Sequence, residues 1–316
     1  MEIKESDEVT DLLKRRMSDQ RIMGIAIALF LGAVTFVLIV RSPISIWNNS
    51  EILTDSSVFE YIAFGMQQGE MPYRDMFDHK GPLLYVINYI GMLIQYYKGV
   101  WYIEFIAVYL TCFFVYKTAR LNCNRLACLG TVIICATLLY NYYEAGNLSE
   151  EYAMPFIGIA LYIFLDYFLN RNISKIRLMV CGFTAGGVCM LRPNMTALWI
   201  VFSLAVILEC VQKKKLRDLS FFILYFCIGF FVLVLPLLIW LVVNNSFTQF
   251  IDCYIDFNMI YSTGNGGKEV MLRRWEAVLF FLREPVTVIA FIISGFLCTT
   301  KRRFLDWTYI IFLLVT

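Results

Sequence analysis

The chain has 316 residues, of which 59% are hydrophobic and 16% are charged, and its mean hydropathy is +0.66. Soluble domains contain roughly 45–50% apolar and about 25% charged residues, so this composition excludes a soluble enzyme and a disordered chain. A net charge of only +2 gives no reason to expect a nucleic-acid partner. The apolar residues occur in blocks long enough to cross a bilayer, which predicts an all-α polytopic membrane protein.

The amino-terminal segment 1–21 carries five Lys and Arg residues and directly precedes an apolar run over 22–40. This run is longer than the core of a signal peptide. The residues that follow it, Arg41, Ser42 and Pro43, do not form a small-residue cleavage site. We therefore predict an uncleaved first membrane helix with a cytoplasmic amino terminus.

Nine apolar runs are predicted to be transmembrane helices, and one further run is not. The nine runs are 22–40, 100–116, 126–140, 152–169, 178–191, 195–211, 219–243, 285–299 and 304–316. The run 82–97 is shorter and contains Asn88 and Gln95, so we place it at the outer surface as an interfacial or half-embedded helix. This assignment puts 18 of the 27 Lys and Arg residues on the cytoplasmic side. The alternative is that 82–97 forms a short transmembrane helix that contains polar residues.

These assignments predict one transmembrane domain over 22–316 in the plasma membrane, with outer segments at 41–100, 141–151 and 244–284. Because the last apolar run has no basic flank before Thr316, we expect the domain to be incomplete at its carboxyl end. The predicted spans contain few charged residues, whereas transporters usually carry ionisable groups deep in the membrane. The chemistry is therefore expected in the outer segments.

The first outer segment contains the densest set of charged residues. Asp55 begins a predicted short helix, Tyr73-Arg74-Asp75 follows a turn, and Asp78-His79-Lys80 precedes the interfacial helix. Arg and Lys side chains at a lipid surface can bind a phosphate group, so Arg74, His79 and Lys80 are candidates for that role. The alternatives are a solvated basic patch and, for Asp55, a helix cap.

Two further candidate carboxylates lie in the second outer segment, and one candidate arginine lies at a later corner between spans. Asn147 precedes Glu150 and Glu151 in the second outer segment, and Arg192 lies at the corner between two predicted spans. Carboxylates in the first turn of a helix are also favourable for purely structural reasons, and an arginine at a helix end can simply extend toward water. Both explanations stay open beside a functional one.

This ordered set of motifs resembles the GT-C membrane glycosyltransferases, in the branch of the bacterial protein-mannosyltransferase-like proteins and the lipid A aminoarabinose transferases. The resemblance covers about 20–210. The matching motifs are Asp55, Pro72–Asp75, Asp78–Pro82, Gly146–Tyr152 and Leu191–Asn194. The chain has Lys80-Gly81-Pro82 where many members have Lys-Pro-Pro or His-Pro-Pro.

The resemblance implies inverting transfer of a sugar from a polyprenyl phosphate to an acceptor hydroxyl at the outer face. It implies Asp55 as the base, Glu150 or Glu151 as acceptor-orienting or metal-binding groups, and Arg74, His79, Lys80 and Arg192 as phosphate-binding groups. Tyr73, Asp75, Asp78 and Asn147 would support them. The acceptor would be a cell-envelope glycan, lipid or protein. No cofactor is required, although the carboxylates suit Mg²⁺ or Mn²⁺. The alternatives are a lipid-sugar flippase, a non-catalytic membrane subunit and an outer-face hydrolase.

Overall fold

The computed structural model describes the backbone of residues 2–47, 55–142 and 146–263, and side chains within 19–47, 55–140 and 146–260. The described residues form an all-α protein. Its α-helices are α1 (Glu2–Ile39), α2 (Asp55–Gln67), α3 (Pro82–Ile94), α4 (Val100–Ala119), α5 (Arg125–Tyr142), α6 (Ser149–Asn170), α7 (Lys175–Cys189), α8 (Ala197–Gln212), α9 (Leu216–Val243), α10 (Phe247–Phe250) and α11 (Phe257–Thr263).

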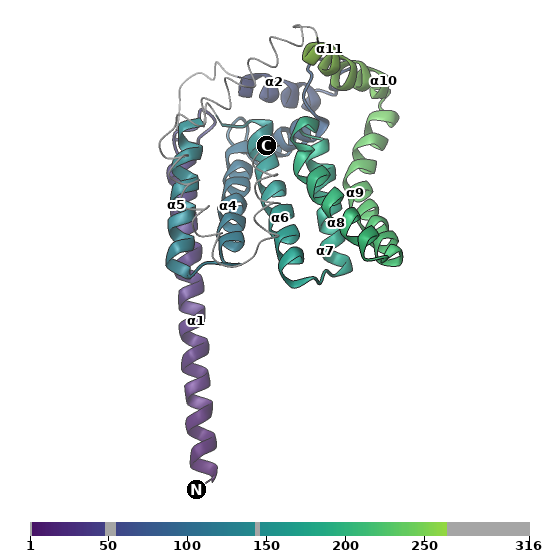
Figure 1. Ribbon diagram of the computed structural model, residues 1–316. Coiled ribbons are helices and arrows are strands. Elements are labelled where there is room, and N and C mark those ends of the chain that lie inside the picture. The colour runs from purple at the N-terminus through teal and green to yellow at the C-terminus, as the bar shows by residue number, and fades with distance from the viewer. Residues whose placement is uncertain (1, 48–54, 143–145, 264–316) are drawn as a thin grey trace.

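The long helices stand side by side, and consecutive helices from α4 to α9 run in opposite directions (Figure 1). The short helices α2, α10 and α11 lie across one end, and α3 packs against α2. We call this end the site end. The turns α4–α5, α6–α7 and α8–α9 lie at the opposite end, which we call the basic end because its turns carry three of the predicted basic clusters.

Five described helical segments are long and apolar enough to cross a membrane, so the protein is a multi-pass membrane protein. The five segments are Asp19–Ile39, Val100–Ala119, Ser149–Asn170, Pro193–Gln212 and Leu216–Val243. The prediction of about nine spans is therefore wrong for the described part of the chain. Helices α5 and α7 are shorter than these five, and the runs 285–299 and 304–316 lie outside the described residues.

Helix α3 is also too short to span, in agreement with the prediction that the run 82–97 does not cross the membrane. It begins at Pro82, and the lack of an N–H on proline does not destabilise the helix there because the first N–H groups of a helix have no partner within it. Its Asn88 is fully buried, and the Asn88 amide donates a hydrogen bond to the carbonyl of Leu84 at 2.9 Å. Asn88, whose polarity argued against a position in the bilayer, therefore has a hydrogen-bond partner inside the protein.

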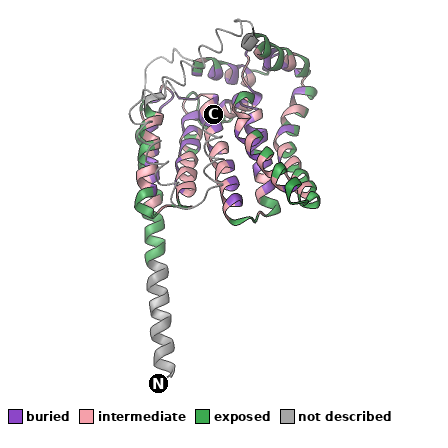
Figure 2. Ribbon diagram, in the orientation of Figure 1, coloured by how far each residue is buried: buried purple, intermediate pink, exposed green. Residues whose placement is uncertain are grey.

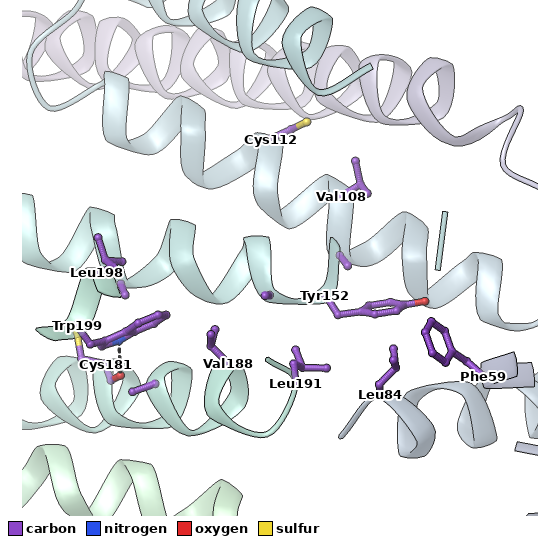
Figure 3. Close-up of a cluster of buried hydrophobic side chains, with 14 of the residues drawn as sticks. Phe59, Leu84, Val108, Cys112, Tyr152, Cys181, Val188, Leu191, Leu198 and Trp199 are labelled. Atoms are coloured by element: carbon purple, nitrogen blue, oxygen red, sulfur yellow. Dashed lines mark hydrogen bonds between the residues drawn. The ribbon is translucent and has the colours of Figure 1, made fainter. Parts of the chain in front are cut away.

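The bundle and the short helices share one hydrophobic core. Figure 3 shows Phe59 of α2 and Leu84 of α3 near Tyr152 of α6, with the cluster continuing toward Trp199 of α8. The Trp199 indole N–H donates to the carbonyl of Cys181 at 3.1 Å. Exposed aliphatic side chains instead cover much of α9 and of the described part of α1, residues 19–39 (Figure 2). Such surfaces are expected to face lipid.

Helices α7 and α9 approach each other most closely at glycines. A Cβ atom built on Gly182 would lie 1.9 Å from the carbonyl oxygen of Phe226, and one on Gly229 would lie 1.8 Å from that of Met179. Gly186 follows Gly182 by one turn and faces Phe230 in the same way. Small residues four apart allow such backbone contact between membrane helices. Helix α7 is therefore packed against protein, which explains why it can be shorter than a lipid-exposed span.

Candidate functional site

Two predicted site segments, 78–82 and 190–194, are joined by backbone hydrogen bonds at the site end. The N–H of Gly81 donates to the carbonyl of Leu191, and that of Leu83 donates to the carbonyl of Met190, each at 3.2 Å. A Cβ on Gly81 would lie 2.0 Å from the Met190 oxygen, so no larger residue fits. This contact satisfies carbonyls at the end of α7 and places Lys80 beside Arg192.

Asp55, His79, Lys80 and Arg192 form what we call the charged cluster. Asp55 is exposed at the start of α2, while the other three residues are partly buried. Burial lowers the pKa of the Lys80 ammonium, the nearby Arg192 lowers it further, and Asp55 opposes both effects. The pKa of Arg192 is likewise lowered by burial and raised by Asp55. These mutual effects place the three segments within range of one another's charges, and the backbone bonds from Gly81 and Leu83 join two of them directly.

His79 belongs to the same electrostatic environment. Burial lowers the pKa of its imidazole, Asp78 raises it, and the charges of Lys80 and Arg192 lower it. Its Nδ1 lies 3.3 Å from a carboxylate oxygen of Asp78. A neutral imidazole beside two cations can still donate one hydrogen bond to an anion.

Glu150 forms an ion pair with Arg192, and both side chains are partly exposed. The hydroxyl of Ser149 donates to the other Glu150 oxygen at 2.7 Å, which fixes the carboxylate at the start of α6. Glu150 therefore orients the guanidinium of Arg192. This is a different role from the acceptor-orienting or metal-binding one that the sequence suggested.

The segment that carries Lys80 is held from several directions. The buried Tyr73 hydroxyl donates to the Lys80 carbonyl at 2.7 Å. The Asp78 carboxylate accepts from the Tyr85 hydroxyl at 2.8 Å and from the N–H of His79 at 2.7 Å. From the other side, Asn258 of α11 donates to the His79 carbonyl at 2.8 Å. Tyr73, Asp78, Tyr85 and Asn258 thus hold the segment in place, and the supporting roles expected for Tyr73 and Asp78 in a donor site stay predictions.

Arg74 and Asp75, in contrast, form a separate group. The Arg74 guanidinium makes a two-pronged contact with Asp75, at 3.0 and 2.7 Å, and donates to the carbonyl of Asn244 at 2.8 Å. Asp75 also accepts from the N–H of Met71 at 2.7 Å. Within the described residues Arg74 thus ties its loop to the end of α9, and the structure does not place it with Lys80 as the sequence suggested.

Glu151 differs from the neighbouring Glu150 because its side chain is buried. Its side chain is only 4% exposed and lies near the buried Glu104 of α4. Glu151 also accepts from the N–H of Leu148 at 3.4 Å, as in a helix cap. The structure therefore gives it a buried, structural position away from the charged cluster.

Asn147 connects α2, α3 and α6 beneath the charged cluster. Its fully buried amide donates to the Ser56 hydroxyl at 2.9 Å and to the Asn88 carbonyl oxygen at 2.7 Å. Its own oxygen accepts from the Tyr152 hydroxyl at 2.8 Å. Because Ser56 directly follows Asp55, this network fixes the start of α2. The backbone of Asn147 has φ +58, a conformation that asparagine tolerates better than most residues.

The sequence analysis did not select Glu60, which lies one turn after Ser56. Its side chain is 4% exposed, and one carboxylate oxygen has no hydrogen-bond partner. Burial raises its pKa from 4.5 to about 7, and the positive charge of Lys98 opposes this shift. An acidic residue one turn into an amphipathic helix gives no sequence signal that separates a buried position from an exposed one.

The raised pKa of Glu60 predicts a pH-dependent stability. The folded state retains the Glu60 proton up to about pH 7, whereas the unfolded chain releases it near pH 4.5, so stability decreases as the pH rises between these values. The full difference is about 3 kcal/mol. Glu60→Gln should remove this component, so that the variant gains stability over the wild type as the pH rises from 5 to 8. Denaturation in detergent across this range tests it, and a constant difference would contradict it.

The charged cluster can bind an anion and accept a proton. Lys80 and Arg192 offer charged donors, His79 offers a further donor, and Asp55 is a carboxylate near all three. Such a set suits a phosphate group together with an adjacent hydroxyl. Within the described ranges, no group of three or more His, Cys, Asp and Glu side chains is arranged to hold a metal ion.

Comparison with known families gives one match. Residues 27–315 match the family described as "Putative competence-induced protein Ccs4 N-terminal domain". The chain belongs to this family. The resemblance to the GT-C glycosyltransferases is therefore incorrect as a family assignment, although it drew attention to residues that the fold brings together. No curated protein and no solved structure matches the chain.

Proposed function

We propose that this Ccs4 N-terminal domain binds a lipid-linked phosphate ester at the site end and transfers its sugar to an acceptor hydroxyl. The donor of this proposal is a polyprenyl-phosphate sugar. The proposal depends on one observation: residues from α2, the 78–80 segment and the 192 corner act on one another's charges. The Asp55 carboxylate thereby faces Lys80, His79 and Arg192, of which His79 also contacts Asp78 and Arg192 also pairs with Glu150.

In the proposed reaction, the acceptor oxygen attacks the anomeric carbon of the sugar, and the bond from that carbon to the phosphate oxygen breaks. Asp55 accepts the proton of the hydroxyl as the new glycosidic bond forms. The bond electrons leave with the polyprenyl phosphate, and Lys80 and Arg192 stabilise the added negative charge. Attack from the side opposite the departing phosphate inverts the configuration of the anomeric carbon.

The membrane orientation is part of the proposal. The turns at the basic end carry Lys and Arg clusters, which favour the cytoplasmic side of a membrane. With the basic end inside, the charged cluster lies at the extracytoplasmic surface, next to the headgroups of the outer leaflet. A polyprenyl phosphate presents its sugar at this depth, whereas nucleotide sugars are cytoplasmic. The acceptor is a hydroxyl of a cell-envelope glycan, lipid or protein.

The direct test supplies the purified full-length protein with a radiolabelled polyprenyl-phosphate sugar and membrane-extracted acceptors, and follows the label. Movement of label to an acceptor supports the proposal. Movement of the intact donor between leaflets of a proteoliposome, without transfer, would instead identify a flippase. Donor that binds but is neither moved nor consumed would identify a non-catalytic subunit, and release of free sugar would identify a hydrolase.

Lys80→Gln should weaken donor binding more than it slows turnover at saturating donor. Removing one charge-assisted contact to phosphate typically costs about 1.5–3 kcal/mol, so the KM for the donor should rise by roughly 10- to 100-fold. Initial rates of label transfer over a range of donor concentrations measure the effect. Lys117→Gln, a partly buried lysine of α4 near the basic end, is the matched control and should leave KM unchanged. An unaltered KM in Lys80→Gln would remove Lys80 from the donor site.

A further inference from the structure

A cavity of about 360 Å³ opens at the basic end, between the carboxyl ends of α6 and α8 and the start of α9. The α6–α7 and α8–α9 turns beside it lie at the end of the bundle opposite α2 (Figure 1), and the cavity plays no part in the proposed transfer reaction. Its charged lining residues are Arg171, Glu209, Lys213, Lys215, Arg217 and Asp218. We call this the basic-end cavity.

The basic-end cavity has a net positive lining. A single carboxylate, Glu209, pairs with both Arg171 and Lys213, and its oxygen lies 2.5 Å from the Lys213 ammonium. Lys215 lies 3.9 Å from Asp218, while Arg217 has no ion-pair partner among the residues the structure describes. Two carboxylates therefore face four cations. Glu209 holds Arg171 and Lys213 close to each other at the wall of the cavity. The four cations together still outnumber the two carboxylates.

The lining of the basic-end cavity is also partly apolar. Three aromatic side chains, Tyr167, Phe221 and Phe222, line it together with Asn172, Ile173 and Cys210. Leu208, which precedes the lining residue Glu209 in α8, is 60% exposed, and Leu224, one turn after the lining residue Phe221 in α9, is 55% exposed. Both helices are long enough to cross the membrane. A ligand that has a charged head and apolar chains would contact both surfaces at once. A cavity of this size lies at the lower end of the range for small-molecule sites and suits a headgroup.

We propose that the basic-end cavity binds a phosphate ester, namely the phosphodiester headgroup of an anionic phospholipid. The cations around Glu209 and Arg217 contact the phosphate oxygens, and the acyl chains lie along the exposed faces of α8 and α9. Basic pockets between membrane helices recognise anionic headgroups in this way. A soluble phosphate ester shares the charge but not the apolar chains, so the exposed aliphatic residues favour the lipid.

The test compares two double variants that lose the same charge at the same end of the bundle. Lys213→Gln/Arg217→Gln removes two lining cations and leaves Glu209 paired with Arg171. Arg125→Gln/Lys214→Gln removes two exposed cations that do not line the cavity. Each full-length protein is purified in detergent, mixed with phosphatidylglycerol or phosphatidylcholine, and analysed by native mass spectrometry for retained lipid.

We expect the wild type and the Arg125/Lys214 variant to retain phosphatidylglycerol in preference to phosphatidylcholine. The Lys213/Arg217 variant should lose roughly tenfold or more of this binding. Competition by millimolar glycerol phosphate, or binding of glycerol phosphate alone, would support the site and show how far a soluble anion can occupy it. Equal retention of both lipids, or equal loss in the two double variants, would overturn the proposal. Neither result depends on transfer activity.

Discussion

Asp55→Asn should reduce transfer from a polyprenyl-phosphate sugar by about 10²- to 10⁴-fold, which is the usual contribution of a positioned general base. The substitution removes the proton acceptor but keeps the size of the side chain and its place at the start of α2. Because Asp55 is exposed and asparagine is also favourable at a helix start, folding should change by less than about 1 kcal/mol. The measurement is the rate of label transfer at saturating donor.

Asp75→Asn is the matched control for this experiment. Asp75 is also a carboxylate at the site end, but it pairs with Arg74 and accepts the N–H of Met71, outside the charged cluster. We expect it to retain turnover near that of the wild type. If Asp55→Asn kept most of its activity, or if both variants lost it equally, Asp55 would not be the base. Donor binding measured on the same samples separates a lost base from a misfolded site.

Gly229→Ala should destabilise the bundle by about 3 kcal/mol, at the upper end of the usual range for overpacking. The added methyl would lie within 2.7 Å of three backbone atoms of Met179, and backbone cannot move aside as a flexible side chain can. Helices α7 and α9 would have to separate. For a domain of this size, the loss corresponds to a decrease in Tm of roughly 5–10 °C. Thermal unfolding in detergent gives the value.

Gly130→Ala is the control for Gly229→Ala. Gly130 lies within α5, and a Cβ built there would meet no atom within 4 Å. Alanine is the better helix former, so this variant should be as stable as the wild type or more stable by up to about 1 kcal/mol. A similar loss of stability in both variants would show that the effect is not due to the contact between α7 and α9.

The hydrophobic blocks predicted the helices well because a block is a local property of the chain. The runs 152–169 and 219–243 correspond closely to α6 and α9. Whether a helix is long enough to cross the membrane was harder to predict. Helix α7 is short and packs against α9 through Gly182 and Gly186, and a hydropathy pattern does not distinguish a lipid-facing block from one that faces another helix.

The site was predictable only in part. Asp55, Lys80 and Arg192 are prominent because charged residues flank apolar runs, and the fold does bring them together. The partners that decide the roles of Arg74 and Glu151 could not be predicted. Arg74 contacts Asn244 and Glu151 contacts Glu104, and both partners are far away in the sequence. Only the packing of the helices brings such pairs into contact.

The family assignment failed for a related reason. Several matching motif positions have local structural explanations that do not require common descent. Gly81 is required by the close backbone of Met190, and Asn147 occupies a left-handed conformation while its amide connects three helices. Such positions follow from the packing of a loop against the end of the bundle and do not identify a family.

The backbone bonds from Gly81 and Leu83 to the end of α7 also constrain how the protein is made. Helices α4, α5, α6 and α7 all follow α3 in the chain, so the carbonyls of Met190 and Leu191 do not exist when α3 leaves the ribosome. At about 5–20 residues per second, synthesis of the intervening chain takes on the order of ten seconds. During that interval α3 can already pack against α2, which precedes it in the chain, but Gly81 and Leu83 lack their backbone partners. The charged cluster can therefore assemble only after most of the bundle has been inserted.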